Sequence, residues 1–184
     1  MIFMEQTDLT LWRVFWMSKE GERILNIGCG NDFYGTDRLD IKPTPSTTIV
    51  HDVERGIPFP DETFDEVYSK NNLEHLRNVG FHFQEVYRVL KKDGKLVLIT
   101  DNASCMRFYL FGTHTGRYER KHEGDHHYSI FTTKYLVNHL EVVGFKDIKW
   151  SYVETDTMGK YLDWFTGLFL KVISQPRIRV EAKK

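Results

Sequence analysis

The sequence predicts an α/β fold built on a doubly wound, mostly parallel sheet. Short apolar or β-branched runs alternate with segments of helical periodicity along the chain. The run Lys95–Thr100 is almost wholly apolar, as is typical of a strand at the centre of a parallel sheet. A glycine turn, Gly28-Cys29-Gly30, follows the first run. Parallel sheets bind their ligands at the carboxyl ends of the strands, so functional residues are expected just after each strand.

The expected strands are Glu22–Ile27, Thr36–Ile41, Thr47–Val50, Phe64–Ser69, Lys95–Thr100, Phe145–Val153 and Arg177–Ala182. Helical spacing of apolar residues predicts helices over Thr10–Ser18, Val79–Lys91 and Thr132–Val143. The second of these is expected to stop at the basic residues and glycine of Lys91–Gly94, and the third at Gly144. We expect the final strand to run antiparallel, which gives a Rossmann-like sheet.

The first crossover is unusually short, because only residues 28–35 separate the first two strands. A parallel crossover usually takes a dozen or more residues. Eight extended residues still reach about 26–29 Å, so the chain can return without a full helix. We therefore predict at most one helical turn there, with the helix over Thr10–Ser18 covering the surface left open.

Length and composition indicate one domain. The 184 residues, 41% of them hydrophobic, can fill a real core, so disorder is excluded as the main state. We expect a single domain over 1–184, with an N-terminal helix in 1–21, a cofactor-binding core over 22–153, and a helix plus the final strand in 154–184. The segment Trp164–Ile173 is too short to span a membrane and is expected to be a buried or docking helix, with a membrane-surface helix as the alternative.

Charge and cysteine content narrow the function classes. The formal net charge of −1 argues against a general nucleic-acid binder, which usually needs a basic excess. Two cysteines are too few for a disulfide scaffold or a four-cysteine zinc site. The absence of a signal peptide or membrane-spanning segment from the sequence, together with this cysteine usage, favours a cytoplasmic protein.

The residues around the first two strands favour a nucleoside-containing ligand. Gly28 and Gly30 allow a sharp turn and close approach of a ligand to the backbone. Phe33 occupies the place of the third glycine in the dinucleotide pattern, which disfavours a pyrophosphate cofactor. Asp40 ends the second strand, where a carboxylate can accept hydrogen bonds from ribose hydroxyls.

Several ordered blocks resemble the class I S-adenosylmethionine-dependent methyltransferases of the small type 11 family. The blocks are ILNIGCGN, an acid ending the second strand, HDVE, PFPDETFDEVYS, NNLEHL, EVYRVLKKDGKLVLIT and HHYSIFTTKYLVNHLEVVGF. Together they cover about residues 22–150. Each block is modest alone, and their order and spacing carry the resemblance.

The resemblance implies S-adenosylmethionine as the cofactor, S-adenosylhomocysteine as the product and a set of cofactor contacts. It places the glycine loop against the methionine part of the cofactor and an acid against the ribose. At the adenine it places an apolar residue and a second acid with its neighbouring backbone amide. Asn71 is placed near the methyl group. The implied cofactor-binding residues are Asn26, Gly28, Cys29, Gly30, Asp40, Ile41, Asp52, Val53 and Asn71. Asn26 stands where the family usually has Asp, so it supplies a hydrogen bond without a charge. Cys29 is interpreted as a small loop residue rather than a nucleophile.

Methyl transfer needs alignment above all, and a hydroxyl acceptor also needs a base. The candidates for a catalytic role are Glu74 and His75 after the fourth strand, Asp101 after the fifth, and His127 before the last helix. Asp101 stands where relatives often have Pro. The other interpretation of Glu74 and His75 is that they orient a loop, and His127 is equally open as a substrate contact or loop anchor.

Other features of the chain bear on metals and on the acceptor. His114, His122, His126 and His127 lie close together in sequence, but they form no tight ligand pair on an expected helix, so no metal is predicted. The basic residues Arg117, Arg120 and Lys121 form either a solvated loop or a site for an anionic acceptor group. Aromatic residues outside the cofactor blocks leave an aromatic or lipid-like acceptor open as well.

The leading hypothesis is transfer of a methyl group from S-adenosylmethionine to an oxygen or nitrogen of a small molecule. Two alternatives stay open: a non-catalytic S-adenosylmethionine-binding partner subunit, and an NAD-dependent oxidoreductase. Nucleic acid is the least favoured substrate. The sequence determines neither the acceptor nor the oligomeric state.

Overall fold

The computed structural model describes residues 21–105, 127–153 and 177–184. The expected helices over Thr10–Ser18 and Trp164–Ile173 lie outside these ranges. The described part forms a seven-stranded sheet in the order β3-β2-β1-β4-β5-β7-β6. The strands are β1 (Ile24–Ile27), β2 (Asp37–Asp40), β3 (Ile49–Val50), β4 (Phe64–Lys70), β5 (Leu90–Asp101), β6 (Lys146–Val153) and β7 (Arg177–Lys183).

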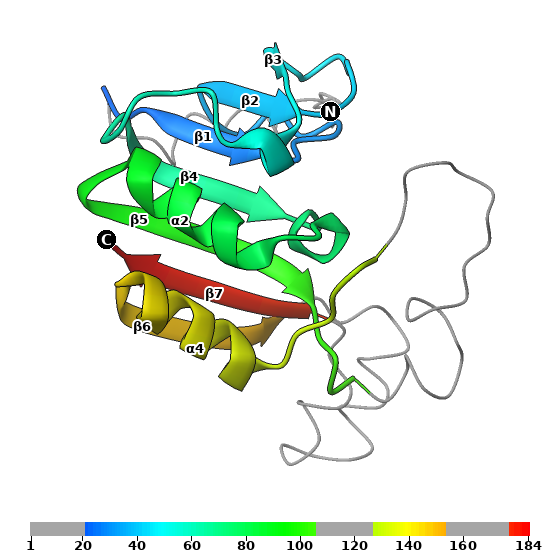
Figure 1. Cartoon of the computed structure of the whole chain (residues 1–184). Helices are drawn as coiled ribbons and strands as arrows, with labels where there is room; N and C mark the ends of the chain where they lie inside the picture. The colour runs from blue at the N-terminus through cyan, green and yellow to red at the C-terminus, as the bar shows by residue number, and fades with distance from the viewer. Residues whose placement is uncertain (1–20, 106–126, 154–176) are drawn as a thin grey trace, which may run out of the picture.

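The sheet confirms the predicted fold class. Strands β1 to β5 pair in parallel, and β7 runs antiparallel to both of its neighbours, β5 and β6. Figure 1 shows the carboxyl ends of β1, β2, β4 and β5 pointing to one edge of the sheet. The winding reverses between β1 and β4, which is where open parallel sheets bind ligands.

Two α-helices in the described part, α2 (Val79–Val89) and α4 (Thr133–Val143), cover the same face of the sheet (Figure 1). The side chain of Asn78 caps α2 by accepting a hydrogen bond from the amide of Phe81. Gly144 ends α4 in the left-handed conformation, as predicted from the sequence.

The predicted end of the second helix is wrong by two residues. Helix α2 ends at Val89, and Leu90 already pairs with Phe64 of β4. Leu90 is fully buried, so core packing overrides the helix-stop signal that follows it. The residues Lys91–Gly94 instead form an irregularity in β5, where the pairing register with β4 shifts.

The short first crossover contains no helix, in agreement with the sequence-based limit. Side-chain hydrogen bonds hold it against β1. The Thr36 hydroxyl donates to the carbonyl of Ile24 and accepts from the Ile24 amide, both at 2.9 Å. The Asn26 amide donates to the carbonyl of Tyr34 at 3.1 Å, so Asn26 fastens the loop as expected for an uncharged replacement of Asp.

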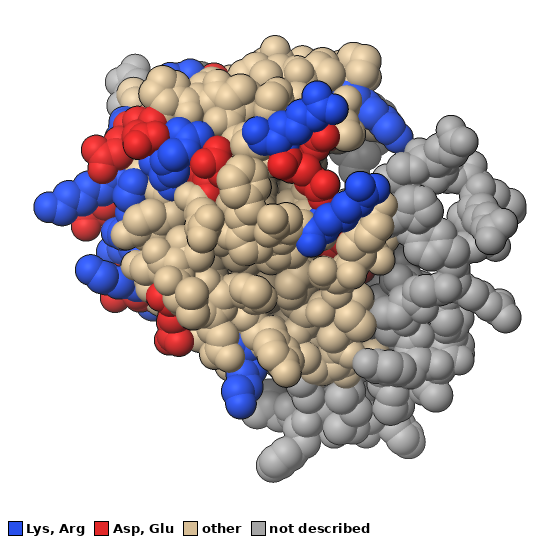
Figure 2. Space-filling model, viewed as in Figure 1, with Lys and Arg blue, Asp and Glu red and all other residues tan. Residues whose placement is uncertain are grey.

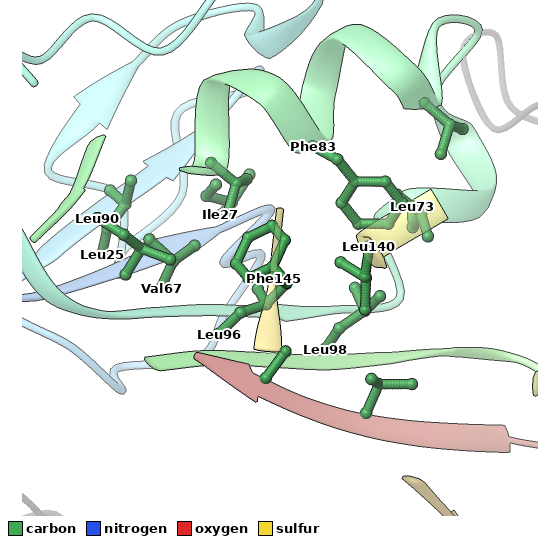
Figure 3. Close-up of a cluster of buried hydrophobic side chains, with 14 of the residues drawn as sticks. Leu25, Ile27, Val67, Leu73, Phe83, Leu90, Leu96, Leu98, Leu140 and Phe145 are labelled. Atoms are coloured by element: carbon green, nitrogen blue, oxygen red, sulfur yellow. The ribbon is translucent and has the colours of Figure 1, made fainter. Parts of the chain in front are cut away.

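The main core lies between the sheet and the two helices. Figure 3 shows Phe83 of α2 and Leu140 of α4 pointing toward the strand residues Leu96 and Leu98. All of these side chains are almost completely buried. Burying one such side chain contributes about 1.5–3 kcal/mol, so this layer fixes the strands whose ends form the site.

Charged residues of both signs intermix on the face shown in Figure 2, and no extended area of one sign covers it. This matches the near-balance of 25 basic and 26 acidic residues. No helix in the described ranges has the length and apolar character needed to cross a membrane.

Candidate cofactor pocket and neighbouring histidine–carboxylate cluster

A pocket of about 240 Å³ lies at the carboxyl ends of β1 and β2, beside the chain that leaves β4. This is slightly below the usual range of small-molecule sites, about 300–1,000 Å³, and fits a nucleoside-sized group. Its lining residues are Gly28, Leu39, Asp40, Ile41, His51, Asp52, Val53, Glu54, Asn72, His75, Leu76, Arg77 and Tyr128.

The structure brings most of the expected cofactor residues into this pocket. Gly28, Asp40, Ile41, Asp52 and Val53 all line it. They come from three separate strand ends, which meet because the strands are parallel neighbours in the sheet. The remaining expected residues, Asn26, Cys29, Gly30 and Asn71, are not among the lining residues.

Those four residues lie behind the pocket wall or shape the turns that form it. The Cys29 thiol points to the hydroxyl of Thr47, 3.6 Å away, and is buried, as expected for a small loop residue. Asn71 adopts a left-handed backbone conformation with φ of 52°, and its backbone amide donates to the carbonyl of Ile99. It is the next residue, Asn72, that lines the pocket.

Gly28 is required where it stands. It adopts a φ of +69°, and a Cβ at this position would lie 2.7 Å from the side chain of Asn72. No real side chain tolerates such a contact without displacement of its neighbour. The missing side chain therefore keeps the loop and the end of β4 close together, with open space beyond them for a ligand.

The acids of the pocket are also fixed by the local backbone. The Asp40 carboxylate accepts hydrogen bonds from the amides of Gly30, at 2.8 Å, and Lys42, at 2.9 Å. Asp52 caps the short 3₁₀ helix η1 (Val53–Arg55) by accepting from the Glu54 amide at 3.0 Å. A carboxylate has about four acceptor positions, so each acid retains capacity for a ligand hydroxyl or amine.

Unpartnered polar atoms gather at the end of β4. The Ser69 hydroxyl, the Asn71 side-chain oxygen and the Asn72 side-chain nitrogen are buried and have no hydrogen-bond partner among the described residues. Buried polar groups are almost always paired, and each exception calls for an explanation. Here the three atoms are close in sequence to one another, and Asn72 lines the pocket.

A histidine–carboxylate cluster adjoins the pocket at the ends of β4 and β5. Glu74 and His75 lie on the 3₁₀ helix η2 (Leu73–His75), which follows β4, while Asp101 ends β5. Nδ1 of His127 lies 3.4 Å from the Asp101 carboxylate, and the rings of His75 and His127 pack edge to face at 4.6 Å. All four residues proposed from the sequence for a catalytic role thus meet in one place.

Backbone pairing brings His127 to this cluster from a distant part of the chain. The amides of Tyr128 and Ser129 donate to the carbonyl of Glu74. Nearby, Asn102 forms a parallel bridge with Phe131. The segment that leads into α4 is therefore fixed against both η2 and the end of β5.

Glu74 is the most deeply buried member, with 2% of its surface exposed. Burial raises the pKa of its carboxyl group, and the nearby Asp101 carboxylate raises it further. The Thr100 hydroxyl donates to Glu74 at 2.9 Å and opposes this shift in the pKa. Two carboxylates and two imidazoles therefore share a small, largely enclosed space.

Comparisons with known proteins identify the domain. A family model described as a methyltransferase domain matches residues 16–98, which include the glycine loop, both pocket acids and the histidine–carboxylate residues of η2. Residues 16–98, a little under half of the chain, therefore match the methyltransferase domain family that the sequence resembles.

Individual relatives of this methyltransferase domain are more distant. Phosphoethanolamine N-methyltransferase 3 of Arabidopsis thaliana is 28% identical over a match that covers 45% of this chain and 21% of the relative. The match thus spans about a fifth of the length of that curated protein.

Two solved structures share the fold of this methyltransferase domain. One is a SAM-dependent methyltransferase from Archaeoglobus fulgidus, with a TM-score of 0.64, 19% identity, and coverage of 95% of this chain and 91% of that one. The other is phosphoethanolamine N-methyltransferase 2 of Haemonchus contortus, in complex with phosphomonomethylethanolamine and S-adenosylhomocysteine. It has a TM-score of 0.58, 15% identity, and coverage of 96% and 52%.

Sequence reasoning missed part of this pocket. Arg77 and Tyr128 line it, and the Arg77 guanidinium donates to the Tyr128 hydroxyl at 3.0 Å while lying 4.9 Å from the ring centre. Their pairing across a long stretch of chain leaves no local pattern. His114, His122, His126 and the basic residues Arg117, Arg120 and Lys121 lie outside the described ranges.

Proposed function

We propose that this chain binds S-adenosylmethionine in the described pocket and transfers its methyl group to a small-molecule acceptor. The observation that carries the proposal is the set of buried, unpartnered polar atoms of Ser69, Asn71 and Asn72 beside a glycine loop. A polar ligand with a nucleoside and an amino-acid part supplies partners for such atoms. An apolar ligand would leave them unpaired.

The pocket residues fit the parts of this cofactor. Asp40 ends β2 and offers its carboxylate to ribose hydroxyls, while Ile41 and Val53 offer apolar contacts to a base. Asp52 presents a carboxylate near the same place, for an exocyclic amine. The loop at Gly28 and the end of β4 remain for the amino-acid part. The bound cofactor supplies a methyl group already activated as a sulfonium.

The protein's own contribution to transfer is to align the acceptor and to exclude water. His75 lines the pocket and also belongs to the histidine–carboxylate cluster, so it connects the two. An oxygen acceptor must in addition lose its proton, and the imidazoles and carboxylates of the cluster are groups that can take it up. An amine acceptor that reacts in its neutral form needs no such group.

A small acceptor with an anionic group is favoured within this proposal. The relative from Haemonchus contortus binds a phosphomonoester, phosphomonomethylethanolamine. Arg77 of this chain lines the pocket, and its guanidinium is of the type that binds phosphate or carboxylate. The balanced overall charge argues against a long polyanion such as nucleic acid.

The test begins with binding of S-adenosylhomocysteine to the full chain, measured by isothermal titration calorimetry. We expect a single site, with affinity reduced about tenfold to a hundredfold in Asp40→Ala, because a hydrogen bond to a charged group contributes about 1.5–3 kcal/mol. Glu141→Ala, an exposed acid on α4, is the matched control and should bind like the parent. Absence of binding, or equal binding by all three proteins, would reject the cofactor assignment.

Transfer itself is tested with cofactor labelled in the methyl group. Purified chain is incubated with pools of small phosphomonoesters, amines and phenols, and the labelled product is identified by mass spectrometry. We expect label in at least one pool. A protein that binds S-adenosylhomocysteine normally and labels no pool would instead support the non-catalytic partner subunit.

A further inference from the structure

The histidine–carboxylate cluster has the donor set of a transition-metal site. Ligand atoms of Glu74, His75 and His127 lie within 4.8 Å of one another. Two imidazoles and one carboxylate are a set that proteins use for catalytic Zn²⁺, with a fourth position left open. The three donors come from η2 and from the segment before α4, so the site exists only in the folded chain.

Asp101 occupies the position of a supporting residue for such a site. Its carboxylate lies 3.4 Å from Nδ1 of His127. Imidazoles that bind metals usually direct their other ring nitrogen to a carboxylate or carbonyl, which fixes the tautomer and the ring orientation. The 3.4 Å contact has the distance of an ion pair rather than the geometry of a hydrogen bond, and metal binding at Nε2 of His127 would align it.

The charge of the cluster also favours a cation. Glu74 is 2% exposed and Asp101 is 8% exposed, so the cluster holds two almost completely buried carboxyl groups. Buried carboxylates are costly unless they are paired or bind a metal. The Thr100 hydroxyl is the partner of Glu74 in the described structure, and it carries no charge.

We propose that Glu74, His75 and His127 bind one divalent transition-metal ion of the Zn²⁺ type, with Asp101 orienting His127. The inference rests on the proposed function and deepens it, because His75 also lines the cofactor pocket. The ion would bind a hydroxyl oxygen of the acceptor at its open position and acidify that hydroxyl, so that the proton passes to water. The oxygen would then bond to the methyl carbon as the carbon–sulfur bond of the cofactor breaks and S-adenosylhomocysteine leaves. The chemistry selected is that of hydroxyl oxygens rather than amines.

The experiment measures metal binding by the full chain without any acceptor. Protein stripped with a chelator is titrated with Co²⁺, whose visible absorption reports the ligands, and with Zn²⁺ by competition. We expect one ion per chain, and at least tenfold weaker binding for His75→Ala, for His127→Gln and for Glu74→Gln. Asp101→Asn should weaken binding by about tenfold to a hundredfold, as expected for a residue that orients a ligand histidine.

His139→Ala is the matched control, since His139 is an exposed histidine on α4 outside the cluster. Far-ultraviolet circular dichroism checks that each variant folds. If His75→Ala does not fold, the near-isosteric Gln and Asn variants still test the metal site. Absence of stoichiometric binding, or equal binding by the cluster variants and His139→Ala, would overturn the inference. The second result would place the ion on other histidines of the chain.

Failure of this inference and failure of the proposed function are distinguishable. Binding of S-adenosylhomocysteine is measured on the same stripped protein. Normal cofactor binding with no metal binding overturns the metal site alone, and leaves methyl transfer to be handled by the cluster as acid and base. Metal binding without cofactor binding overturns the proposed function instead.

Discussion

The two ends of the parallel strands treat buried polar groups in opposite ways. At the amino ends of β4 and β5, the Arg88 guanidinium donates to Glu85, to Asp61 and to the carbonyls of Ile57 and Phe59. At the carboxyl end of β4, several buried polar atoms have no partner among the described residues. The first end is a network of paired groups, and at the second end the unpaired atoms of the described residues leave positions that a ligand can fill.

The difference separates stability from function along one set of strands. A network of paired groups at the amino ends keeps the strands in register and needs no ligand. Unpaired groups at the carboxyl ends cost stability, and the packed layer beneath α2 and α4 offsets that cost (Figure 3). Substitutions at the two ends should therefore affect different measurements.

The largest effect is expected at the glycine loop. Gly28→Ala places a Cβ 2.7 Å from Asn72 and should push that side chain into the pocket. We expect affinity for S-adenosylhomocysteine to fall about a hundredfold, which corresponds to about 2.7 kcal/mol. Isothermal titration calorimetry measures this, and the melting temperature reports any loss of stability.

Gly30→Ala is the matched control for that substitution. Gly30 also has a positive φ, of +52°, but a Cβ there would meet nothing within 4 Å. Both variants carry the same left-handed backbone penalty, about 1 kcal/mol, so the difference between them isolates the contact with Asn72. Equal affinities in the two variants would remove the argument that Gly28 keeps ligand space open.

The opposite end should respond in stability alone. Arg88→Met keeps the apolar stem and removes the charge, which leaves the carbonyls of Ile57 and Phe59 without this donor, while Glu85 keeps its hydrogen bond from the Ile57 amide. We expect the free energy of unfolding to fall by about 2–3 kcal/mol in urea denaturation, with affinity for S-adenosylhomocysteine unchanged. Lys183→Met, at an exposed ion pair of 3.7 Å, should change stability by less than about 1 kcal/mol. A large loss of ligand affinity in Arg88→Met would contradict the separation of the two ends.

The sequence predicted the strands and the pocket acids well for a physical reason. Asp40 and Asp52 follow strands directly, and parallel neighbours bring such residues to one edge whatever their order in the chain. The expected contact of Asn71 with the cofactor stays a prediction; its neighbour Asn72 lines the pocket, and Asn71 takes a left-handed backbone conformation with φ of 52°. A single unusual φ is not encoded in hydrophobic periodicity.

The cluster was predicted residue by residue, but not as a unit. Glu74, His75, Asp101 and His127 were separate candidates, each next to a strand end. Their meeting depends on the hydrogen bonds of Tyr128 and Ser129 to Glu74 and on the bridge between Asn102 and Phe131. These are tertiary pairings between distant segments, so no local sequence pattern predicts them. The end of α2 was missed for a similar reason, since the burial of Leu90 decides it.

His82 provides a second test of the separation between the two ends of the strands, because it is an unpartnered buried group away from the pocket. Its Nδ1 has no hydrogen-bond partner in the described part of the chain, and it lies on α2 among core residues. Burial lowers the pKa of His82 to about 4, while the nearby Glu85 carboxylate acts weakly in the opposite direction. The imidazole is therefore neutral in the folded protein at any ordinary pH.

The sign of the effect on stability follows from proton binding. Below about pH 6.5 the unfolded chain binds a proton at His82, and the folded chain does not until about pH 4. Stability from this group is thus fully present above pH 6.5 and is lost as the pH falls toward 4. Between pH 7 and pH 5 the loss should be about 2 kcal/mol.

Comparison of the parent with His82→Leu, by urea denaturation at several pH values, isolates this contribution from that of the carboxylates. We expect the variant to lose less stability than the parent between pH 7 and pH 5, with equal cofactor affinity at pH 7. His139→Leu, at an exposed position, should follow the parent. Weaker binding of S-adenosylhomocysteine by His82→Leu would mean that buried unpaired groups away from the pocket also contribute to ligand binding. That result would contradict the separation of stability and function between the two ends of the strands.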